Sequence, residues 1–370
     1  MTLSGRMSPR LDALRHALET VDAAVAVFGL SSNLRYLTGF SDEPGERMLL
    51  LIVPRNGEAA LIVPELYADQ VEALSPAALL RVWADGEDPG TLLDAIASGL
   101  SQVPGKVLLD DSLWSVFALR VQMAFSGRSF ELASAVMAPL RALKDDAEIA
   151  AMKRAGEITD GAYAAVTAKP ISGVTEIELA RRLEAAMLAS GADGIAFETL
   201  VASGLNSALP HHRAGMRRIE SGDVVILDYG CRVDGYCSDM TRTVVCGSPT
   251  PELERVYAAV RNAHLAARDR AGIGVRAEEV DDAAREVLTE AGYGARFVHR
   301  TGHGIGLDVH EPPYIVRGNE QRLEKGMAFS IEPGAYFTER FGVRIEDVVI
   351  VGDVGVVPMT EAPQELKYVE

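Results

Sequence analysis

Apolar and turn-forming positions are most clearly organised between residues 222 and 245. Strand-forming residues occupy 224–227 and again 241–245, and the sequence Val-Asp-Gly at 233–235 lies between them. Two apolar runs joined by a short turn signal are typical of an antiparallel pair of strands. The pattern therefore predicts a β-hairpin.

Two acidic residues, Asp228 and Asp239, lie eleven positions apart within this hairpin. A turn centred on 233–234 places them directly opposite each other, and a turn on 234–235 moves the partner by two positions. Both turns leave the two carboxylates on one face, because side chains of a strand alternate with a period of two. Like charges this close repel each other unless a cation lies between them, which makes the hairpin a candidate platform for metal ions. The alternative is a solvated hairpin with scattered acids.

The first 140 residues show the pattern of a small α/β domain. Short apolar runs that predict strands alternate with helical patterns, and an Arg-Asn-Gly turn signal at 55–57 joins two of them. The predicted strands cover 24–28, 48–53, 59–63 and 107–109. Asn33 and the stretch 36–40 form a polar and aromatic cluster, which we interpret as a strand-edge turn packed on the core. The boundary of this domain is expected near 139–144.

The remaining residues, 141–370, contain two rounds of helices followed by antiparallel strands. The predicted helices cover 145–168, a second segment from an N-cap at Thr175 to Gly191, a third that starts at Pro251, and 277–291. The clearest later strands are 327–332 and 343–351. Each round ends with a pair of acids, so the pattern indicates a weak internal repeat with a pseudo-twofold site between its halves. His264 lies on an apolar helix stripe, which favours a core histidine over a ligand.

The overall charge limits the classes of partner. The chain of 370 residues has a formal net charge of −17, which argues against nucleic acid or an anionic membrane as a partner and suits a site that gathers divalent cations. No apolar run reaches the length of a membrane span, and residues 1–19 resemble an amphipathic helix and not a signal peptide. Of three cysteines, Cys231 and Cys237 lie on opposite hairpin faces by parity, so a reduced, cytoplasmic setting is expected.

The second round of strands supplies further candidate ligands. His303 lies in a glycine-rich stretch, TGHGIGLDVHE at 301–311, and flanking glycines allow a close approach of the backbone to a bound group. A phosphate-binding loop is the rival interpretation, but no Lys-Ser or Lys-Thr pair follows. Glu332 and Glu346 each interrupt or end an apolar strand, where a charge is costly unless it is paired or bound to a metal. The alternative for both is an exposed acid at a strand end.

These residues form a coherent set of metal ligands. Four carboxylates and one imidazole are mostly oxygen donors, which favours Mn²⁺ or Co²⁺, with Zn²⁺ and Fe²⁺ as alternatives. Four negative charges also match the charge of two divalent ions. The candidate ligands are Asp228, Asp239, His303, Glu332 and Glu346.

Four motifs of the second part, in this order, resemble those of the pita-bread metallopeptidases. They are LDYG…DGYCSDMTRT, GHGIGLDVHE, IEPGAY and GVRIEDVV, and the segment NSALPHHR at 206–213 resembles the prolidase version. The stretch NLRYLTGF at 33–40 is similar to the creatinase-type N-terminal domain. Methionine aminopeptidases usually lack that domain, and creatinases lack the full metal set, which is intact here. The closest branch resembles Xaa-Pro dipeptidases (prolidases) and Xaa-Pro aminopeptidases.

The resemblance covers nearly the whole chain and implies both fold and metal site. The implied fold is a creatinase-like α/β domain at 1–140, serving substrate access and dimerisation, followed by an α+β pita-bread catalytic domain at 141–370 with pseudo-twofold halves. Asp228 would bind one ion, and His303 and Glu332 the other. Asp239 and Glu346 would bridge the ions, and a water activated between them would attack the substrate. Glu332 would also transfer the proton to the leaving prolyl nitrogen.

Further roles follow from the same resemblance. His310 would hydrogen-bond the substrate or the tetrahedral intermediate. His211 matches the histidine that guides substrate and protons at the rim, and the adjacent His212 is the weaker candidate. Arg344, two residues before Glu346, would hold that carboxylate or one of the substrate. Arg317 is a weaker candidate for the carboxyl end of the substrate.

The function implied is hydrolysis of the amide bond before proline in dipeptides or short peptides, by a homodimer with two divalent ions, Mn²⁺ first among them. An Xaa-Pro aminopeptidase acting on longer peptides and a hydrolase of non-peptide amides remain alternatives, because all three would use the same metal motifs. A non-catalytic binding protein of this fold is disfavoured, since all five ligands are present.

Overall fold

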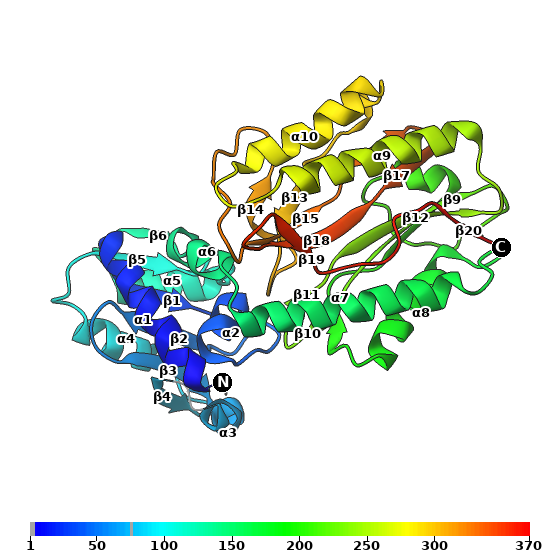
Figure 1. Ribbon diagram of the computed structural model, residues 1–370. Coiled ribbons are helices and arrows are strands. Elements are labelled where there is room, and N and C mark those ends of the chain that lie inside the picture. Colours follow the sequence, from blue (N-terminus) through cyan, green and yellow to red (C-terminus); the bar gives the residue numbers. More distant parts are fainter. Residues whose placement is uncertain (1–3, 75–76) are drawn as a thin grey trace. The chain divides into compact units, whose positions relative to one another are not determined.

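The chain divides into two compact units, Met1–Arg141 and Ala142–Glu370. The structure, a computed structural model, describes residues 4–74 and 77–370 (Figure 1). Residues 1–141 are called unit 1, and residues 142–370 are called unit 2.

Unit 1 is built on a mixed sheet of six strands in the order β4-β3-β2-β1-β5-β6, within its described residues. All four predicted strands are present, with ends shifted by up to two residues. The edge strands β4 and β6 were missed by the sequence analysis because their side chains are largely exposed and make no continuous apolar run. The strands are β1 (Ala23–Phe28), β2 (Leu50–Pro54), β3 (Ala59–Pro64), β4 (Ala78–Trp83), β5 (Lys106–Leu109) and β6 (Phe130–Leu132).

Helices cover the sheet of unit 1. They are α1 (Ser4–Thr20), α2 (Ser32–Thr38), α3 (Glu65–Ala73), α4 (Gly90–Gly99), α5 (Ser115–Ala124) and α6 (Ser134–Ala142). Apolar side chains of α4 and α5 pack on the central strands, and every residue of β1 is buried. The stretch 36–40 belongs to helix α2 and its C-cap, so the expected strand-edge turn is wrong. Asn33 donates to Asp110 over 3.1 Å, a pairing too distant in sequence to be foreseen.

Unit 2 is organised around a large sheet of mainly antiparallel strands in the order β14-β13-β15-β18-β12-β9-β8, with β19 on β18 and β20 on β12. Unit 2 also contains two smaller sheets, a two-stranded sheet β16-β17 and a three-stranded sheet β11-β10-β7. The strands are β7 (Gly194–Ile195), β8 (Leu200–Ser203), β9 (Val224–Tyr229), β10 (Cys231–Val233), β11 (Tyr236–Cys237), β12 (Met240–Cys246), β13 (Gly302–Gly304), β14 (Glu311–Ile315), β15 (Ala328–Ile331), β16 (Gly334–Phe337), β17 (Phe341–Arg344), β18 (Glu346–Val351), β19 (Val356–Pro358) and β20 (Lys367–Val369).

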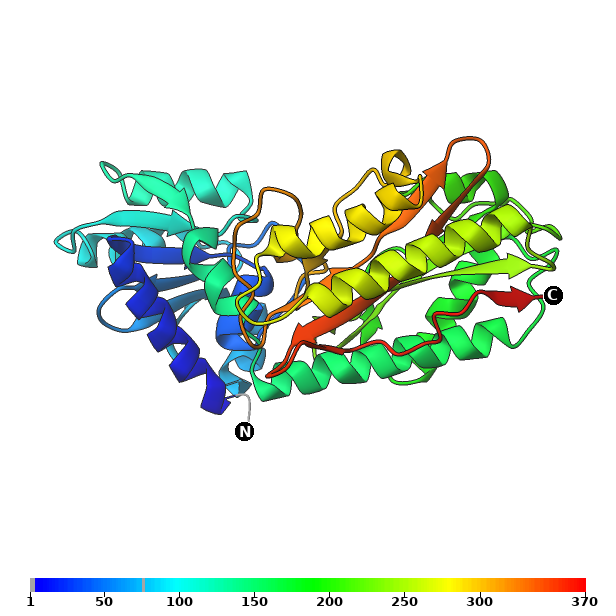
Figure 2. The same ribbon diagram turned by 45° about the horizontal axis from the view of Figure 1, so that its top comes forward.

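Two pairs of helices pack against two halves of this sheet, as the predicted internal repeat requires (Figures 1 and 2). The first pair begins with reciprocal capping boxes at Asp145 and Thr175, and the third helix begins with an N-cap at Thr250 before Pro251. The helices are α7 (Asp146–Thr167), α8 (Glu176–Ala189), α9 (Pro251–Arg270) and α10 (Ala277–Glu290), with 3-10 turns η1 (Gly204–Ala208) and η2 (Gly294–Arg296).

The predicted β-hairpin is present as β9 and β12, continued at its tip by β10 and β11. Asp234 and Gly235 both have positive φ, 50° and 82°, which is the backbone of the turn that best matches the twist of a hairpin. The register pairs Asp228 with Thr241. Asp239 is therefore displaced by two positions, as the turn on 234–235 predicts.

The predicted strand 343–351 is in fact two strands of different sheets. β17 pairs with β16, whereas β18 lies in the centre of the large sheet, and the chain changes direction at Ile345. The other predicted strand, 327–332, ends in a similar way. Pro333 has no N–H to donate to a ladder, and it separates β15 from β16. The bend places Glu332 and Glu346 where two sheets meet.

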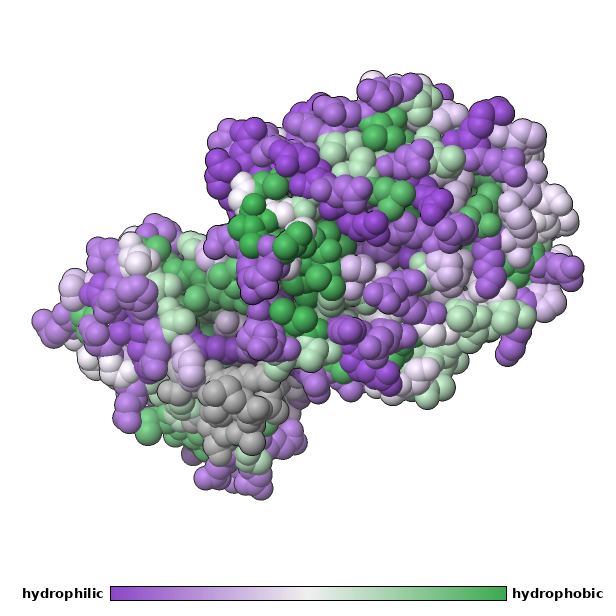
Figure 3. All heavy atoms as spheres, viewed as in Figure 1, coloured by the Kyte–Doolittle hydropathy of each residue, from purple (hydrophilic) through white to green (hydrophobic). Residues whose placement is uncertain are grey.

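The core and surface follow the expected division of side chains. His264 is fully buried, with Nε2 3.2 Å from Oδ2 of Asp347, which confirms the interpretation as a core histidine. The cysteines are free thiols. Figure 3 shows hydrophilic side chains over much of the outward surface of α10. Among the described residues, no helix combines the length and apolar character needed to cross a bilayer.

Candidate active site

The two hairpin carboxylates face a common space with unsatisfied oxygens. Asp228 lies near the end of β9, and Asp239 precedes β12 with only 4% of its surface exposed. The Oδ1 atoms of both are buried and have no hydrogen-bond partner among the described residues. A buried acceptor without a partner costs about 1–3 kcal/mol, so the pair fits a bound cation.

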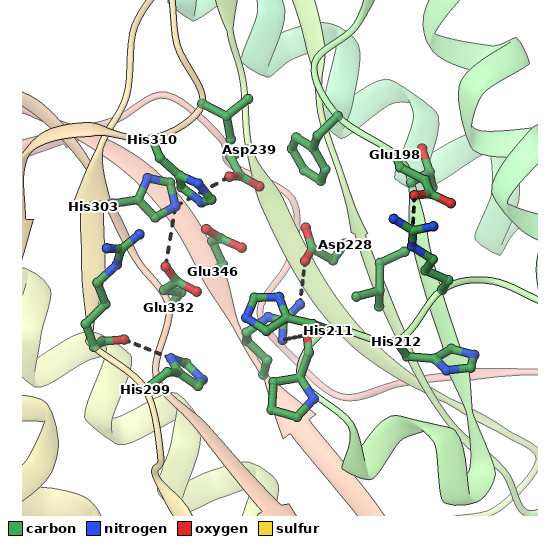
Figure 4. A pocket seen from close by; sticks show the side chains of 18 residues that line it. Glu198, His211, His212, Asp228, Asp239, His299, His303, His310, Glu332 and Glu346 are labelled. Carbon is green, nitrogen blue, oxygen red and sulfur yellow. Dashed lines mark hydrogen bonds and ion pairs between the residues drawn. The ribbon is translucent and has the colours of Figure 1, made fainter. Parts of the chain in front are cut away.

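Three further ligand candidates converge on these carboxylates from the second round of strands. His303 lies in β13, Glu332 follows β15, and Glu346 begins β18. Nε2 of His303 is 3.8 Å from Oδ2 of Asp239 and 3.5 Å from Oε1 of Glu332. Donor atoms of Asp239, His303 and Glu346 lie within 4.8 Å of one another. Figure 4 shows all five predicted ligands pointing toward one another.

The hydrogen bonding of His303 prepares its ring for a ligand role. Its Nδ1 donates to the carbonyl oxygen of Gly304 over 3.0 Å, which leaves the lone pair of Nε2 facing the carboxylates. Burial, and then the nearby His310, lower the pKa of His303 to about 3. The ring is therefore neutral at physiological pH and able to bind a metal.

The carboxylates cannot all be ionised with the protein groups alone. Burial raises the pKa of Asp239 well above its usual range, and the charges of Glu346, Asp228 and Glu332 raise it further. Burial and Glu332 do the same to the pKa of Glu346. For Glu332, burial outweighs the opposing charge of Arg344 and raises the pKa to about 7. Divalent cations would remove this repulsion, and a mostly oxygen donor set suits them.

Arg344 supports the site from behind Asp228. Its Nη2 donates to Oδ2 of Asp228, and its Nη1 donates to the hydroxyl of Tyr336 over 2.9 Å. Its Nε donates to Oγ1 of Thr241 over 3.1 Å, and that hydroxyl donates to Glu346 over 2.7 Å. The guanidinium thus holds Asp228 directly and Glu346 through Thr241, because residues 344 and 346 lie in strands of two different sheets.

Two adjacent histidines of the segment 206–213 face different partners. His211 is exposed and lies on the wall of the cavity, while Nε2 of His212 is 2.9 Å from Oε2 of Glu176. His310, also on the wall, packs edge-on against His303 with ring centroids 4.2 Å apart. These positions suit a rim role for His211 and a substrate contact for His310.

A cavity of about 660 Å³ in unit 2 joins these groups. Its wall includes the five candidate ligands and the histidines just described, together with Phe197 and Leu200. Arg317 lies outside this wall: its side chain is 70% exposed, and Nη2 is 2.9 Å from Oδ1 of Asp282.

His299 and Arg300 lie on the wall and were not among the residues singled out in the sequence. Nε2 of His299 lies 3.0 Å from the hydroxyl of Tyr336, and Nδ1 donates to the carbonyl oxygen of Arg300 over 2.8 Å. Burial lowers the pKa of His299 to about 3, so the ring is neutral. The signal available in the sequence was its spacing, four residues before the candidate ligand His303.

Comparison with known proteins decides the family. Residues 150–353 match metallopeptidase family M24, and residues 10–143 match the creatinase/prolidase N-terminal domain. The chain belongs to metallopeptidase family M24. It is 41% identical over 356 residues to a probable dipeptidase, PepE, of Mycobacterium tuberculosis, covering 95% of this chain and 94% of that protein.

Two further relatives extend the match over nearly the whole chain. The chain is 35% identical over 368 residues to an Xaa-Pro dipeptidase of Lactobacillus delbrueckii subsp. lactis, covering 96% of this chain and 98% of that protein. A crystal structure of recombinant prolidase from Thermococcus sibiricus superimposes with a TM-score of 0.94 at 39% identity, covering 98% and 99% of the two chains. These matches confirm the predicted pita-bread fold class and the metallopeptidase assignment.

Proposed function

We propose that this metallopeptidase is an Xaa-Pro dipeptidase, which hydrolyses the amide bond before proline in dipeptides or short peptides. The observation that carries the proposal is the convergence of five ligand side chains, two of them with orphaned carboxylate oxygens, on one cavity. Two relatives described above, a probable dipeptidase and an Xaa-Pro dipeptidase, support the same substrate class.

We propose two divalent ions, with Mn²⁺ as the working metal. Asp228 would hold one ion, His303 and Glu332 the other, and Asp239 and Glu346 both. The orphaned oxygens of the two aspartates and the lone pair of His303 support this set. When bound, such ions supply Lewis acidity and lower the pKa of a water molecule toward neutrality.

The protein groups around that centre have separate tasks in the proposed reaction. Glu332 would accept the proton of the attacking water and deliver it to the prolyl nitrogen. His310 would donate a hydrogen bond to the oxygen on which negative charge develops. His211 would orient the peptide at the rim. Arg344 holds Asp228 in place, so its role in this scheme is to position a ligand and not to bind the substrate carboxylate.

We also propose a cytoplasmic homodimer in which residues 1–140 limit access to the pocket and contribute to dimerisation. The free thiols support a reducing setting. The dimer and the role of the first domain rest on the family resemblance. Light scattering across micromolar concentrations would contradict the dimer if it gave the mass of one chain, 39.6 kDa.

The experiment that tests the function is an assay of the Mn²⁺-loaded protein on Ala-Pro beside Ala-Pro-Ala. Turnover of Ala-Pro alone supports the dipeptidase, and faster turnover of Ala-Pro-Ala supports the Xaa-Pro aminopeptidase. No turnover of either favours the hydrolase of non-peptide amides. Exhaustive chelation should abolish the activity, and full turnover by protein verified to be free of metal would refute the metal mechanism.

A further inference from the structure

A buried ion pair involves the residue directly after His310. Nζ of Lys144 lies 2.6 Å from Oε1 of Glu311, and the two side chains are only 1% and 7% exposed. Taking two charges out of water is costly, and apolar side chains of similar volume often stabilise a fold equally well. Stability alone therefore does not account for the pair, and the geometry that it imposes on its neighbours becomes the point of interest.

The ring of His310 is placed without a hydrogen bond of its own. In the described part of the chain, no group donates to or accepts from either of its nitrogens. The ring packs edge-on against His303, with centroids 4.2 Å apart, and both rings lie on the cavity wall (Figure 4). The direction of the His310 ring thus depends on the backbone that carries it.

Glu311 fixes that backbone at the end of the glycine-rich loop. It begins β14, pairs with Gly304 of β13, and is 6% exposed, whereas the preceding His310 lies on the cavity wall. Gly306 leaves room for the ion pair, because a Cβ at this position would lie 2.6 Å from Oε1 of Glu311 and 3.1 Å from Cε of Lys144. The strand pairing and the ion pair together hold the C-terminal end of the loop.

Lys144 is itself fixed by the backbone around it. Its N–H donates to the carbonyl oxygen of Gly326 over 3.0 Å, and the preceding Leu143 forms a β-bridge with Met327. Met327 directly precedes β15. Lys144 therefore ties the backbone that enters β15 to the start of β14, and its ammonium group is a firm support for the carboxylate of Glu311.

We propose that Lys144 is a positioning residue of the peptidase: its ion pair with Glu311 fixes the backbone at His310 and so directs that ring at the oxygen on which charge develops. This inference rests on the proposed function and adds what aligns one of its groups. Lys144 is not among the residues of the cavity wall, so it acts through Glu311. A misplacement of about 1 Å caused by a remote change can lower a rate about 10²-fold, so the alignment matters.

The test measures Lys144→Met in the parent and in the His310→Ala background, with Mn²⁺-loaded protein and Ala-Pro. In the parent, the change should lower kcat roughly 10- to 50-fold, with KM within about twofold and metal content unchanged, because a contact made in the transition state is weakened. In the His310→Ala background it should lower kcat less than about twofold, since no ring remains to be misplaced. An equal loss in both backgrounds would overturn the inference.

Two further variants separate alignment from stability. Lys106→Met removes a more exposed Lys-Glu pair of the same length, 2.6 Å, and should change kcat less than about twofold. Lys144→Met combined with Glu311→Leu leaves no unpaired buried charge, so its melting temperature should return toward that of the parent. Its kcat should stay low, because apolar contact is not directional. Recovery of kcat together with stability, or failure of both Lys144 variants to fold, would make the pair structural and overturn the inference.

The same assays distinguish this inference from the proposed function. A parent that cleaves Ala-Pro and whose kcat is unaffected by Lys144→Met would overturn the inference and leave the peptidase intact. A parent that cleaves no Xaa-Pro substrate would overturn the proposed function, and this inference with it.

Discussion

Nε2 of His212 lies 2.9 Å from Oε2 of Glu176, whereas the preceding His211 is exposed on the cavity wall. Glu176 is fully buried in the first turn of α8 and accepts hydrogen bonds from the backbone N–H of Ser203 and the side chain of Asn206, over 2.8 and 2.9 Å. One carboxylate thus ties η1 and the segment after it to a helix. His212 belongs to this anchor although it also lines the cavity, whereas His211 lies exposed on the cavity wall.

The two neighbouring histidines should therefore respond differently to removal. His211→Ala should lower kcat roughly 10²-fold without lowering stability, since it removes a polar contact to the reacting peptide. His212→Ala should lower the free energy of unfolding by about 1–2 kcal/mol, because the buried carboxylate of Glu176 loses a hydrogen-bond partner. It should lower kcat by less than about tenfold. Thermal melts and kinetics of both variants decide this, and the reverse pattern would exchange the two roles.

His310→Ala should reduce kcat far more than metal content. A loss on the order of 10²–10³ is typical of a removed electrostatic or proton-transfer group. Metal content measured by elemental analysis should match that of the parent, because His310 is assigned to the substrate and not to the ions. Loss of metal in parallel with activity would instead make His310 a ligand.

The features predicted best from the sequence are those with local causes. The hairpin followed from strand formers around an Asp-Gly turn, and even its register was one of two alternatives. The acids Glu332 and Glu346 could be singled out because a charge in an apolar strand needs a counter-charge. Such signals depend on a few consecutive residues and do not depend on the tertiary structure of the rest of the chain.

The features that were missed depend on long-range geometry. Arg344 was expected to hold Glu346 or a carboxylate of the substrate, but its guanidinium donates directly to Asp228 and reaches Glu346 through Thr241. Arg317 follows the same glycine-rich region as His310 in sequence, yet its side chain points to Asp282. Arg300 could not be singled out in the sequence, since its place on the cavity wall becomes visible only in the folded chain. Period and spacing cannot supply that information.

The metal-free protein should become less stable as the pH rises from about 6.5 through about 7, the raised pKa of Glu332. The pKa values of Asp239 and Glu346 are raised well above their usual range in the folded state, and that of Glu332 to about 7. The folded state therefore holds protons that the unfolded chain has already released, and each excess proton is worth about 1.4 kcal/mol per pH unit. Below about pH 6.5 the effect should weaken, because the lowered pKa values of His299 and His303 act in the opposite direction.

Denaturant unfolding with a chelator, at both ends of this pH range, checks the sign. A parallel series with saturating Mn²⁺ is the control, because ligands bound to metal no longer hold the excess protons. Metal-free stability that is constant or increases with pH would show that the carboxylates do not repel one another in the folded protein.

Asp239→Asn should have opposite effects on the metal-free and the metal-loaded protein. Burial and three neighbouring carboxylates oppose the charge of Asp239, so its removal near neutral pH should not lower the melting temperature when a chelator is present. Ions that bind only the folded state stabilise the parent by RT ln(1 + [L]/Kd), about 2.7 kcal/mol at a hundredfold excess over Kd. The variant should lose most of this gain, and its activity, because an amide replaces a carboxylate proposed to contact both ions. Melts of parent and variant, each with chelator and with Mn²⁺, give the four values needed. If the variant keeps the full Mn²⁺ shift of the parent, Asp239 does not bridge two ions, and the hairpin is not the platform of the metal site.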